Sequence, residues 1–431
     1  MVSEPVLEPG RMKLKHMRWY VAALLFTSTV INYVDRQTLS VLAPVLTREL
    51  HLTDREYAAI LQAFLYAYTV MYVFSGILVD RWGTRRALSV FMVWWSASSV
   101  LHAFARNAWH LGLCRFLLGV GEPGNFMAAF RVVSEWYPPR EKAFVNGLVN
   151  AGAAVGAVIA PPLVVWLMSL YGWRATFVVA GLLGFGWLAA WLFLYDVPER
   201  CRRIAPGELA LIGGAGPRGR RLTPWKNLLL SRTTWALLLP RFVSDPVWWF
   251  YLFWLPKYLV EKRGFTMAEI GLLGWIPYLS ADIGSIGGGL LSGFLVKRGF
   301  PVIRARFAVM VPCALLMPLS IFVSVEPSPT LTLALTCVIT LAHMGWRANL
   351  STLTNDLFPT HVVGSVSGII AFGTGTGGAL FTFLTGRIVE AHSYGPMFVL
   401  MGLLHPLALL IVWRLAPRRP PEDADFAAQL A

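Results

Sequence analysis

The sequence predicts an all-α membrane protein whose twelve transmembrane helices form two similar halves of six. Three observations support this fold class. Of the 431 residues, 56% are hydrophobic and only 14% are charged, which is more apolar than soluble domains usually are. Apolar runs of about 20 residues, the length a helix needs to cross a bilayer, recur along the whole chain. Short patterns of the first half also recur in the second.

The twelve spans are placed on the apolar runs, with ends set to within about three residues. The first run begins near Trp19; it is too long for a signal peptide and lacks a small-residue cleavage site, so we expect it to be retained. In chain order, the spans cover 19–45, 57–79, 87–105, 110–136, 143–169, 173–195, 234–260, 267–296, 305–325, 330–357, 362–389 and 394–415.

The charges predict how the chain lies in the membrane. The formal net charge is +14, and its cations gather in alternate loops, as the positive-inside rule requires of the cytoplasmic side. This clustering explains the charge without a nucleic-acid partner. We therefore expect two bundles, 19–195 and 234–416, joined by cytoplasmic segments. Those segments are the tails 1–18 and 417–431 and the central loop 196–233.

The cysteines occur singly, so the sequence predicts no disulfide framework, no zinc site and no cofactor. They are Cys114, Cys201, Cys313 and Cys337.

Short motifs of the first half recur in the second half at a nearly constant distance along the sequence. Gly76-Ile-Leu-Val-Asp80-Arg81 recurs as Gly293-Phe-Leu-Val-Lys297-Arg298, and Glu135-Trp-Tyr-Pro138 recurs as Asp356-Leu-Phe-Pro359. Parallel repeats of six helices around a site at mid-membrane are the architecture of alternating-access carriers.

Charged residues inside the spans are the candidate site residues. In span four, Arg115 and Glu122 are seven residues apart, so on a helix they lie about 20° apart on one stripe. An ionised side chain at mid-membrane costs roughly 3 kcal/mol or more and normally faces a cavity or a partner. The stripe is therefore either a structural ion pair or an anion-binding arginine beside a protonatable acid.

Further intramembrane charges stand in other spans. In span one, Asn32 and Arg36 are four residues apart and share a face. Asp282 in span eight is a candidate functional acid or a structural partner of Arg347 in span ten. Arg241 and Asp245, four apart in span seven, favour a structural or gate pair.

The loop after span two carries a recognisable signature. Gly76-x-Leu-x-Asp80-Arg81-x-Gly83-x-Arg85-Arg86 resembles the loop signature of the major facilitator superfamily. The resemblance implies that superfamily's twelve-helix fold, and gating roles for Asp80, Arg81 and Arg85, with Asp80 latching a neighbouring helix end.

Within that superfamily, the chain resembles the anion:cation symporter branch and, more closely, bacterial hexuronate permeases. The residues that carry this resemblance are Ile31-Asn32-Tyr33-Val34-Asp35-Arg36, Arg115-Phe-Leu-Leu-Gly119-x-Gly121-Glu122, Asn150-Ala-Gly152, Asp245 to Tyr258, and Ala281-Asp282-Ile-Gly284-Ser285.

The resemblance implies roles for individual residues. Asp35 and Glu122 match acids linked to proton coupling, and Arg36 and Arg115 match arginines linked to anion recognition or to gating against those acids. Tyr33 matches a binding-site hydroxyl.

Three further substrate contacts are expected. Tyr251, from the aromatic cluster of span seven, is our candidate cavity hydroxyl, and Trp346 and Asn349 are candidate sugar contacts.

Two departures from the hexuronate permeases stand out. Arg347 occupies a position where a small residue is expected, so it either adds an anion contact or pairs with Asp282. Glu122-Pro123-Gly124-Asn125 stands where the permeases more often have Glu-Ala followed by a bulky residue, which leaves the local helix shape and the neighbouring pocket open.

Together these features predict a proton-coupled symporter, not an enzyme, that imports a sugar-acid anion such as glucuronate or galacturonate. As in the bacterial permeases, we expect a monomer in the inner membrane with both termini cytoplasmic. The alternatives are a carrier of another organic anion, such as galactonate, tartrate or an aromatic acid, and a membrane sensor or enzyme. The last class is disfavoured because the sequence shows no output domain and no nucleophile–base or metal constellation.

Overall fold

The computed structural model describes residues 16–417 apart from 202, 213–224, 327 and 359–362. Most of both predicted tails, and part of the predicted central loop, therefore lie outside the described residues. Two short helices of that loop are described, α7 (Pro206–Ile212) and α8 (Trp225–Leu230).

The described helices make up twelve membrane spans. The first half consists of α1 (Met17–Glu49), α2 (Asp54–Trp82), α3 (Thr84–Leu101), α4 (Ala108–Gly121) with α5 (Pro123–Trp136), and α6 (Pro139–Leu194), which contains two spans. The second half consists of α9 (Arg232–Arg263), α10 (Met267–Leu273) with α11 (Ile276–Lys297), α12 (Val302–Leu316) with α13 (Ser320–Val325), α14 (Pro329–Leu357), α15 (Val363–His392) and α16 (Gly395–Leu415).

Judged by length and composition alone, seven helices of the described chain can cross a membrane, or eight if the bent helix α2 counts as one span. This number is smaller than the twelve spans for three physical reasons. The 56-residue α6 turns back at Gly172, whose φ of 77° places it in a backbone region that glycine tolerates. Span four is divided into two helices of 14 residues each. The helices α1 and α9 carry intramembrane charges that lower their hydropathy.

Span four divides at the motif that departs from the family pattern. Glu122 is the last residue before α5, and Pro123 opens that helix. Proline has no N–H for the preceding turn and favours the first position of a helix. The division places the Glu122 side chain at a joint in mid-membrane.

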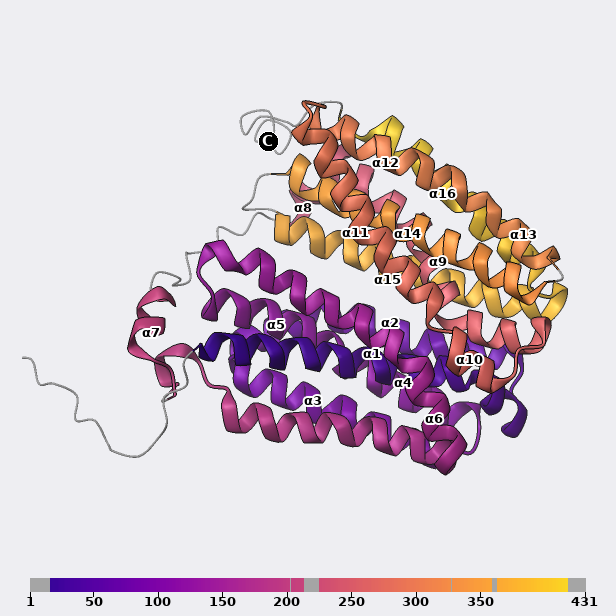
Figure 1. The fold of residues 1–431 in the computed structure, drawn as a ribbon, viewed down its shortest axis with the longest axis horizontal. Coiled ribbons are helices and arrows are strands. Elements are labelled where there is room, and N and C mark those ends of the chain that lie inside the picture. The colour runs from indigo at the N-terminus through magenta and orange to yellow at the C-terminus, as the bar shows by residue number, and fades with distance from the viewer. Residues whose placement is uncertain (1–15, 202, 213–224, 327, 359–362, 418–431) are drawn as a thin grey trace, which may run out of the picture.

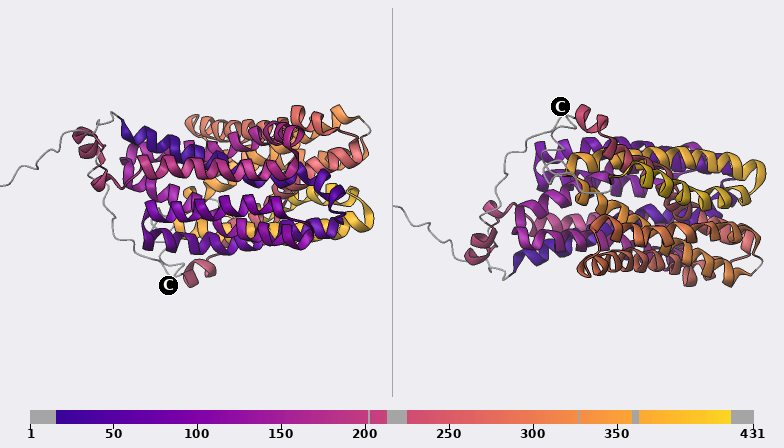
Figure 2. Two further views of the ribbon diagram at one scale, coloured as in Figure 1. Left: turned by 90° about the horizontal axis from the view of Figure 1, so that it is seen from below. Right: turned by 90° about the horizontal axis from the view of Figure 1, so that it is seen from above.

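The two halves lie side by side, the first from indigo to magenta and the second from orange to yellow (Figure 1). The long helices of both halves run along one common direction (Figure 2). The halves meet mainly where α2 contacts α15, α1 contacts α9, and α6 contacts α10. We call the end that carries Met17 and Leu415 the tail end, and the opposite end, with Thr53 and Gly264, the distal end.

Polar contacts join the halves at the distal end. The Lys257 ammonium forms ion pairs with Asp54 of the other half and with Glu261 of its own helix. Arg55 pairs with Glu390 at 2.9 Å. These contacts tie the two halves together at the distal end.

At the tail end, ion pairs join helices within each half. Arg131 on α5 contacts Asp80 at 3.4 Å and Glu135 at 2.9 Å. In the second half, Arg306 contacts Asp356 at 2.9 Å. Glu135 also accepts a hydrogen bond from Thr84 of α3 at 3.0 Å. Because Glu135 and Asp356 are the repeat-related acids of the sequence, the same motif joins helices in both halves.

Within the second half, glycines let α11 and α14 approach closely. A Cβ atom added at Gly284 would lie 2.1 Å from the carbonyl oxygen of Leu341, and one added at Gly288 would lie 2.8 Å from the Cα of Gly345. Close approach through small residues is a common way for membrane helices to pack. This contact holds in place the two helices that carry Asp282 and Arg347.

We expect Gly284→Ala to destabilise the protein because the methyl group forces α11 and α14 apart, at a cost of about 1–3 kcal/mol. Gly287→Ala is the matched control, since nothing lies within 4 Å of a Cβ at that position. Thermal unfolding of the detergent-solubilised protein measures both variants. Equal melting temperatures for the two would contradict the close contact.

Candidate functional site

A cavity of 350 Å³ lies between the halves at the middle of the bundle. From the first half, it is lined by Tyr33, Arg36, Leu65, Tyr68, Thr69, Tyr72, Phe126, Phe130, Asn150, Ala153, Ala154 and Ala157. From the second half, it is lined by Arg241, Trp248, Trp249, Tyr278, Asp282, Ser285, Met344, Arg347, Ala371, Thr374 and Gly375.

The central interaction of the first half is an ion pair between Arg36 and Glu122. Nε and Nη2 of Arg36 donate to Oε2 of Glu122 at 2.9 and 2.5 Å. Arg36 is 2% exposed and Glu122 is 0% exposed. A charge-assisted contact of this kind offsets part of the cost of holding two charges in the membrane.

Aromatic rings surround the Arg36 guanidinium. Its carbon lies 4.7 Å from the centre of the Tyr33 ring, 4.8 Å from that of Tyr68 and 5.4 Å from that of Phe64. Ring faces attract a cation without neutralising its charge. The guanidinium is therefore held at the cavity wall by these rings as well as by Glu122.

Arg115 lies behind this pair, outside the cavity lining. Its Nη2 donates to the backbone carbonyl of Arg36 at 2.9 Å, and its side chain is 0% exposed. Glu122 of the predicted stripe is thus paired with Arg36 from α1, while Arg115 supports the backbone of α1.

Asp35 is also buried outside the cavity lining, and it accepts a hydrogen bond from the Ser99 hydroxyl at 2.7 Å. Its second carboxylate oxygen has no hydrogen-bond partner among the described residues. Asp35 and Glu122 therefore occupy separate surroundings, the first bound to a hydroxyl and the second to a guanidinium.

In the second half, Arg241 and Asp245 form the expected pair at 3.1 Å. The Thr374 hydroxyl donates to the same Asp245 oxygen at 2.8 Å, and Arg241 donates to the Ser351 hydroxyl at 3.1 Å. Arg241 lines the cavity, but its charge is already balanced.

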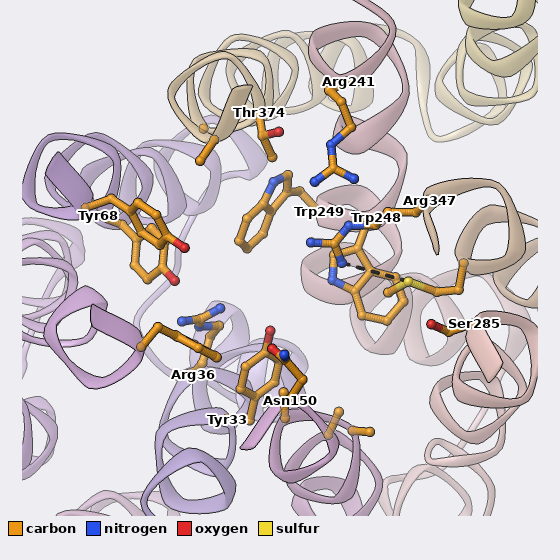
Figure 3. A pocket seen from close by; sticks show the side chains of 18 of the residues that line it. Tyr33, Arg36, Tyr68, Asn150, Arg241, Trp248, Trp249, Ser285, Arg347 and Thr374 are labelled. Atoms are coloured by element: carbon orange, nitrogen blue, oxygen red, sulfur yellow. Dashed lines mark hydrogen bonds between the residues drawn. The ribbon is translucent and has the colours of Figure 1, made fainter. Parts of the chain in front are cut away.

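Arg347 and Asp282 both line the cavity, and the ion pair considered between them is not formed. In the part of the chain that the structure describes, no acidic oxygen lies within 4.0 Å of Arg347 and no basic nitrogen within 4.0 Å of Asp282. The guanidinium of Arg347 reaches the Met344 sulfur at 3.8 Å. Figure 3 shows Arg36 and Arg347 entering the same space from opposite walls.

Besides Arg115, three further predicted substrate contacts lie outside the lining of this cavity. The Tyr251 hydroxyl is 3.0 Å from the Ser320 hydroxyl, within an aromatic cluster of the second half. Trp346 donates to the Ser244 hydroxyl at 3.2 Å. Asn349 donates to the carbonyls of Gly288 and Gly345, at 3.1 and 3.0 Å. Each of these buried side chains therefore joins its helix to another, although Oδ1 of Asn349 has no hydrogen-bond partner among the described residues.

The predicted gating residues lie at the tail end, away from the cavity. Asp80 contacts Arg131, as described above, while Arg81 is exposed. Arg85 pairs with Asp196 at 3.0 Å and donates to the carbonyl of Leu192 at 2.7 Å. These are contacts within the first half.

Several cavity residues are neutral, so the search for charged residues within the spans did not identify them. On α2, Leu65, Tyr68, Thr69 and Tyr72 recur at the spacing of one helix face, a pattern that could have revealed them. Asn150 belongs to a motif quoted for the family resemblance but was given no role. Trp248 and Trp249 belong to an aromatic cluster that the sequence alone could not divide into cavity-facing and other rings.

The sequence pattern of the Major Facilitator Superfamily matches residues 25–382. The chain belongs to the Major Facilitator Superfamily. This confirms the predicted family and fold class, and it makes the protein a secondary transporter and not an enzyme.

Curated relatives in the superfamily cover nearly the whole chain. The hexuronate transporter of Escherichia coli (strain K12) is 31% identical over 415 residues, 95% of this chain and 96% of its own length. The galacturonate transporter of Dickeya chrysanthemi is 31% identical over 71% of this chain and 90% of its own. A probable sulfoacetate transporter of Cupriavidus necator is 30% identical over 97% of both chains.

Among solved structures, the chain is similar to a bacterial homologue of the human lysosomal transporter Spinster in an inward-facing, unoccupied conformation. The TM-score is 0.71 at 18% identity, over 97% of this chain and 98% of the other. At this identity, the likeness supports the superfamily fold alone.

The new placement of Tyr251 predicts a contrast between two Tyr→Phe variants. Tyr251→Phe removes a buried hydrogen bond to Ser320 and should lower the free energy of unfolding by about 1 kcal/mol. Tyr33→Phe removes a hydroxyl at the cavity and should leave it nearly unchanged. Thermal unfolding without ligand measures both, and a larger loss of stability in Tyr33→Phe than in Tyr251→Phe would contradict these assignments.

Proposed function

We propose that the chain is a proton-coupled symporter that imports a sugar-acid anion, a hexuronate such as glucuronate or galacturonate. The observation that carries the proposal is the buried Arg36–Glu122 pair at the wall of the central cavity. The similarity to hexuronate and galacturonate transporters supports the choice of substrate.

The chemistry of the cavity suits a hexuronate. Such a molecule offers one carboxylate and several hydroxyl groups. The planar guanidinium of Arg36 can bind a carboxylate through two parallel hydrogen bonds. Neutral polar groups line the cavity nearby and suit the hydroxyls, namely Tyr33, Tyr68, Asn150, Ser285 and Thr374.

Proton coupling follows from competition for Arg36. While Glu122 is ionised, it occupies two nitrogens of that guanidinium. When Glu122 takes a proton, it loses the charge that holds Arg36, and the substrate carboxylate can replace it. Asp35, bound to Ser99, is the second acid proposed to carry a proton.

Such coupling also solves an electrical problem. An anion that enters a cell moves against a negative interior, at about 2.3 kcal/mol per charge and 100 mV. Two protons moving with a monoanion make the net charge of the step positive, so that the membrane potential then drives uptake.

In the proposed orientation, the tail end faces the cytoplasm of a bacterial inner membrane. The tail-end cations Arg81, Arg85 and Arg86 agree with the positive-inside rule. The structure then represents a state sealed toward the outside by Asp54 and Lys257. Asp80, Arg81 and Arg85 would act in gating at the cytoplasmic face, and the monomer would be the working unit.

One observation favours a second candidate substrate, an aromatic acid. Eight aromatic residues line the cavity, among them Trp248, Trp249, Tyr68 and Tyr72. An aromatic acid could stack on these rings while its carboxylate binds Arg36. Other anions of the branch, such as galactonate or tartrate, would use the hydroxyl-binding groups instead.

The first experiment is uptake of labelled D-glucuronate into proteoliposomes with an inside-alkaline pH gradient. We expect the wild type to accumulate substrate and Glu122→Gln to lose accumulation by about tenfold or more, because glutamine cannot exchange a proton. Exchange of internal for external substrate should persist in the variant.

Glu199→Gln, an exposed glutamate outside the spans, is the control and should transport like the wild type. Uphill uptake by Glu122→Gln would show that another residue carries the coupled proton. If the wild type takes up no hexuronate, that choice of substrate is wrong, and uptake of aromatic acids and aldonates decides the alternatives.

A further inference from the structure

A second pocket, of 870 Å³, lies at the tail end of the second half, between the start of α9 and the end of α16. It is lined by Leu230 at the end of α8, by Ser231, Arg232 and Thr233 at the start of α9, and by residues 413–417. None of these residues lines the central cavity. The pocket is thus separate from the site proposed for the substrate.

The start of α9 lacks the usual partners for its backbone N–H groups. Those of Thr234 and Trp235 donate to the carbonyl of Ser231, whereas those of Arg232 and Thr233 have no partner within the helix. Ser231 is the N-cap residue, but its side chain makes no capping hydrogen bond, and the first turn holds no acid. This end of a 32-residue helix therefore carries an unbalanced partial positive charge.

The Ser231 hydroxyl is a second polar group without a partner at this place. Ser231 is 3% exposed, and its Oγ makes no hydrogen bond to any described residue. The same residue lines the pocket. Because a buried hydroxyl is normally hydrogen-bonded, this observation points, independently of the helix end, to a ligand with oxygen atoms that accept hydrogen bonds.

Two arginines make the pocket strongly positive. Nη2 of Arg232 donates to the backbone carbonyl of Arg414 at 2.9 Å, which joins the start of α9 to the end of α16. The Arg414 guanidinium carbon lies 5.8 Å from the centre of the Trp413 ring. Within the described residues, neither guanidinium has an acidic oxygen within 4.0 Å. Together with the helix end, the arginines form a site for an anion.

Apolar side chains beside the arginines indicate which kind of anion fits. Leu230 is 73% exposed and Trp413 is 60% exposed, at an end of the bundle where the spans begin and finish. Tryptophan is typical of the level of the lipid headgroups. A free inorganic anion gains nothing from these side chains, whereas the acyl chains of a lipid would cover them.

We propose that this pocket binds the phosphate of an anionic glycerophospholipid such as phosphatidylglycerol. Arg232, Arg414 and the N-terminus of α9 hold the phosphate oxygens. Ser231 donates a hydrogen bond to one of them, and the acyl chains lie along Leu230 and Trp413. Basic pockets between membrane helices are known to bind lipid headgroups. Phosphatidylethanolamine has the same phosphate but binds less well, because its ammonium group lies beside two arginines.

Native mass spectrometry of the delipidated protein in detergent tests the inference. Phosphatidylglycerol and phosphatidylethanolamine with identical acyl chains are titrated separately. We expect the wild type to bind phosphatidylglycerol at least about fivefold more tightly, which is the contribution of roughly one arginine near a headgroup. In the double variant Arg232→Gln/Arg414→Gln, this preference should disappear and the affinity for phosphatidylglycerol should fall by about tenfold or more.

Two further variants make the result specific. Arg304→Gln removes an exposed arginine near the start of α12, at the tail end of the same half but outside the pocket, and should bind both lipids like the wild type. Ser231→Ala keeps both arginines and removes only the unpaired hydroxyl, so it should weaken phosphatidylglycerol by about threefold. If the double variant does not fold, Ser231→Ala decides the result.

Inorganic phosphate distinguishes a lipid from a free anion at this site. Millimolar phosphate should leave the binding of phosphatidylglycerol within about twofold of its original strength, because acyl chains add to the affinity of the lipid. Displacement of the lipid by phosphate would assign the pocket to a free anion and overturn the proposal. Equal binding of the two lipids by the wild type overturns it as well, as does unchanged binding of phosphatidylglycerol in the double variant and in Ser231→Ala.

Discussion

The cost of holding charge inside a membrane governs this structure. Arg36 and Glu122 are almost fully buried at mid-membrane, and neither could remain ionised there alone. The joint at Pro123 places Glu122 opposite α1, and the rings of Tyr33, Tyr68 and Phe64 hold the arginine in position. Because burying the ion pair costs free energy, a proton that neutralises Glu122 or an anion that binds Arg36 can break it.

The rest of the bundle holds the charged side chains of the cavity in two separate walls, one from each half. Arg115 fixes the backbone of α1 behind the first wall, and the glycine contact between α11 and α14 fixes the second. Trp346 and Asn349 donate hydrogen bonds to α9 and α11, so they join helices of the second half. The cavity is lined by residues of both halves, so a ligand in it contacts both.

The sequence was sufficient for the parts of this picture that depend on length, hydropathy and repetition. Twelve spans, the division into halves and the identity of the intramembrane charges all follow from it. It could not say which charges meet, because Arg36 and Glu122 are 86 residues apart and pairing depends on how helices are rotated. Tyr251 shows the same limit: residues 244–259 of α9 are buried on every side, so hydrophobic periodicity cannot tell which side faces the cavity.

At the tail end, Arg131 and Arg306 form ion pairs within their own halves, whereas Asp54–Lys257 and Arg55–Glu390 at the distal end cross between the halves. The alternating-access motion that we propose would leave the first set intact and break the second. Under that proposal, the rate at which the unloaded protein changes between its two states depends on a few side chains far from the cavity. Substitutions there would alter turnover without altering which substrate is recognised.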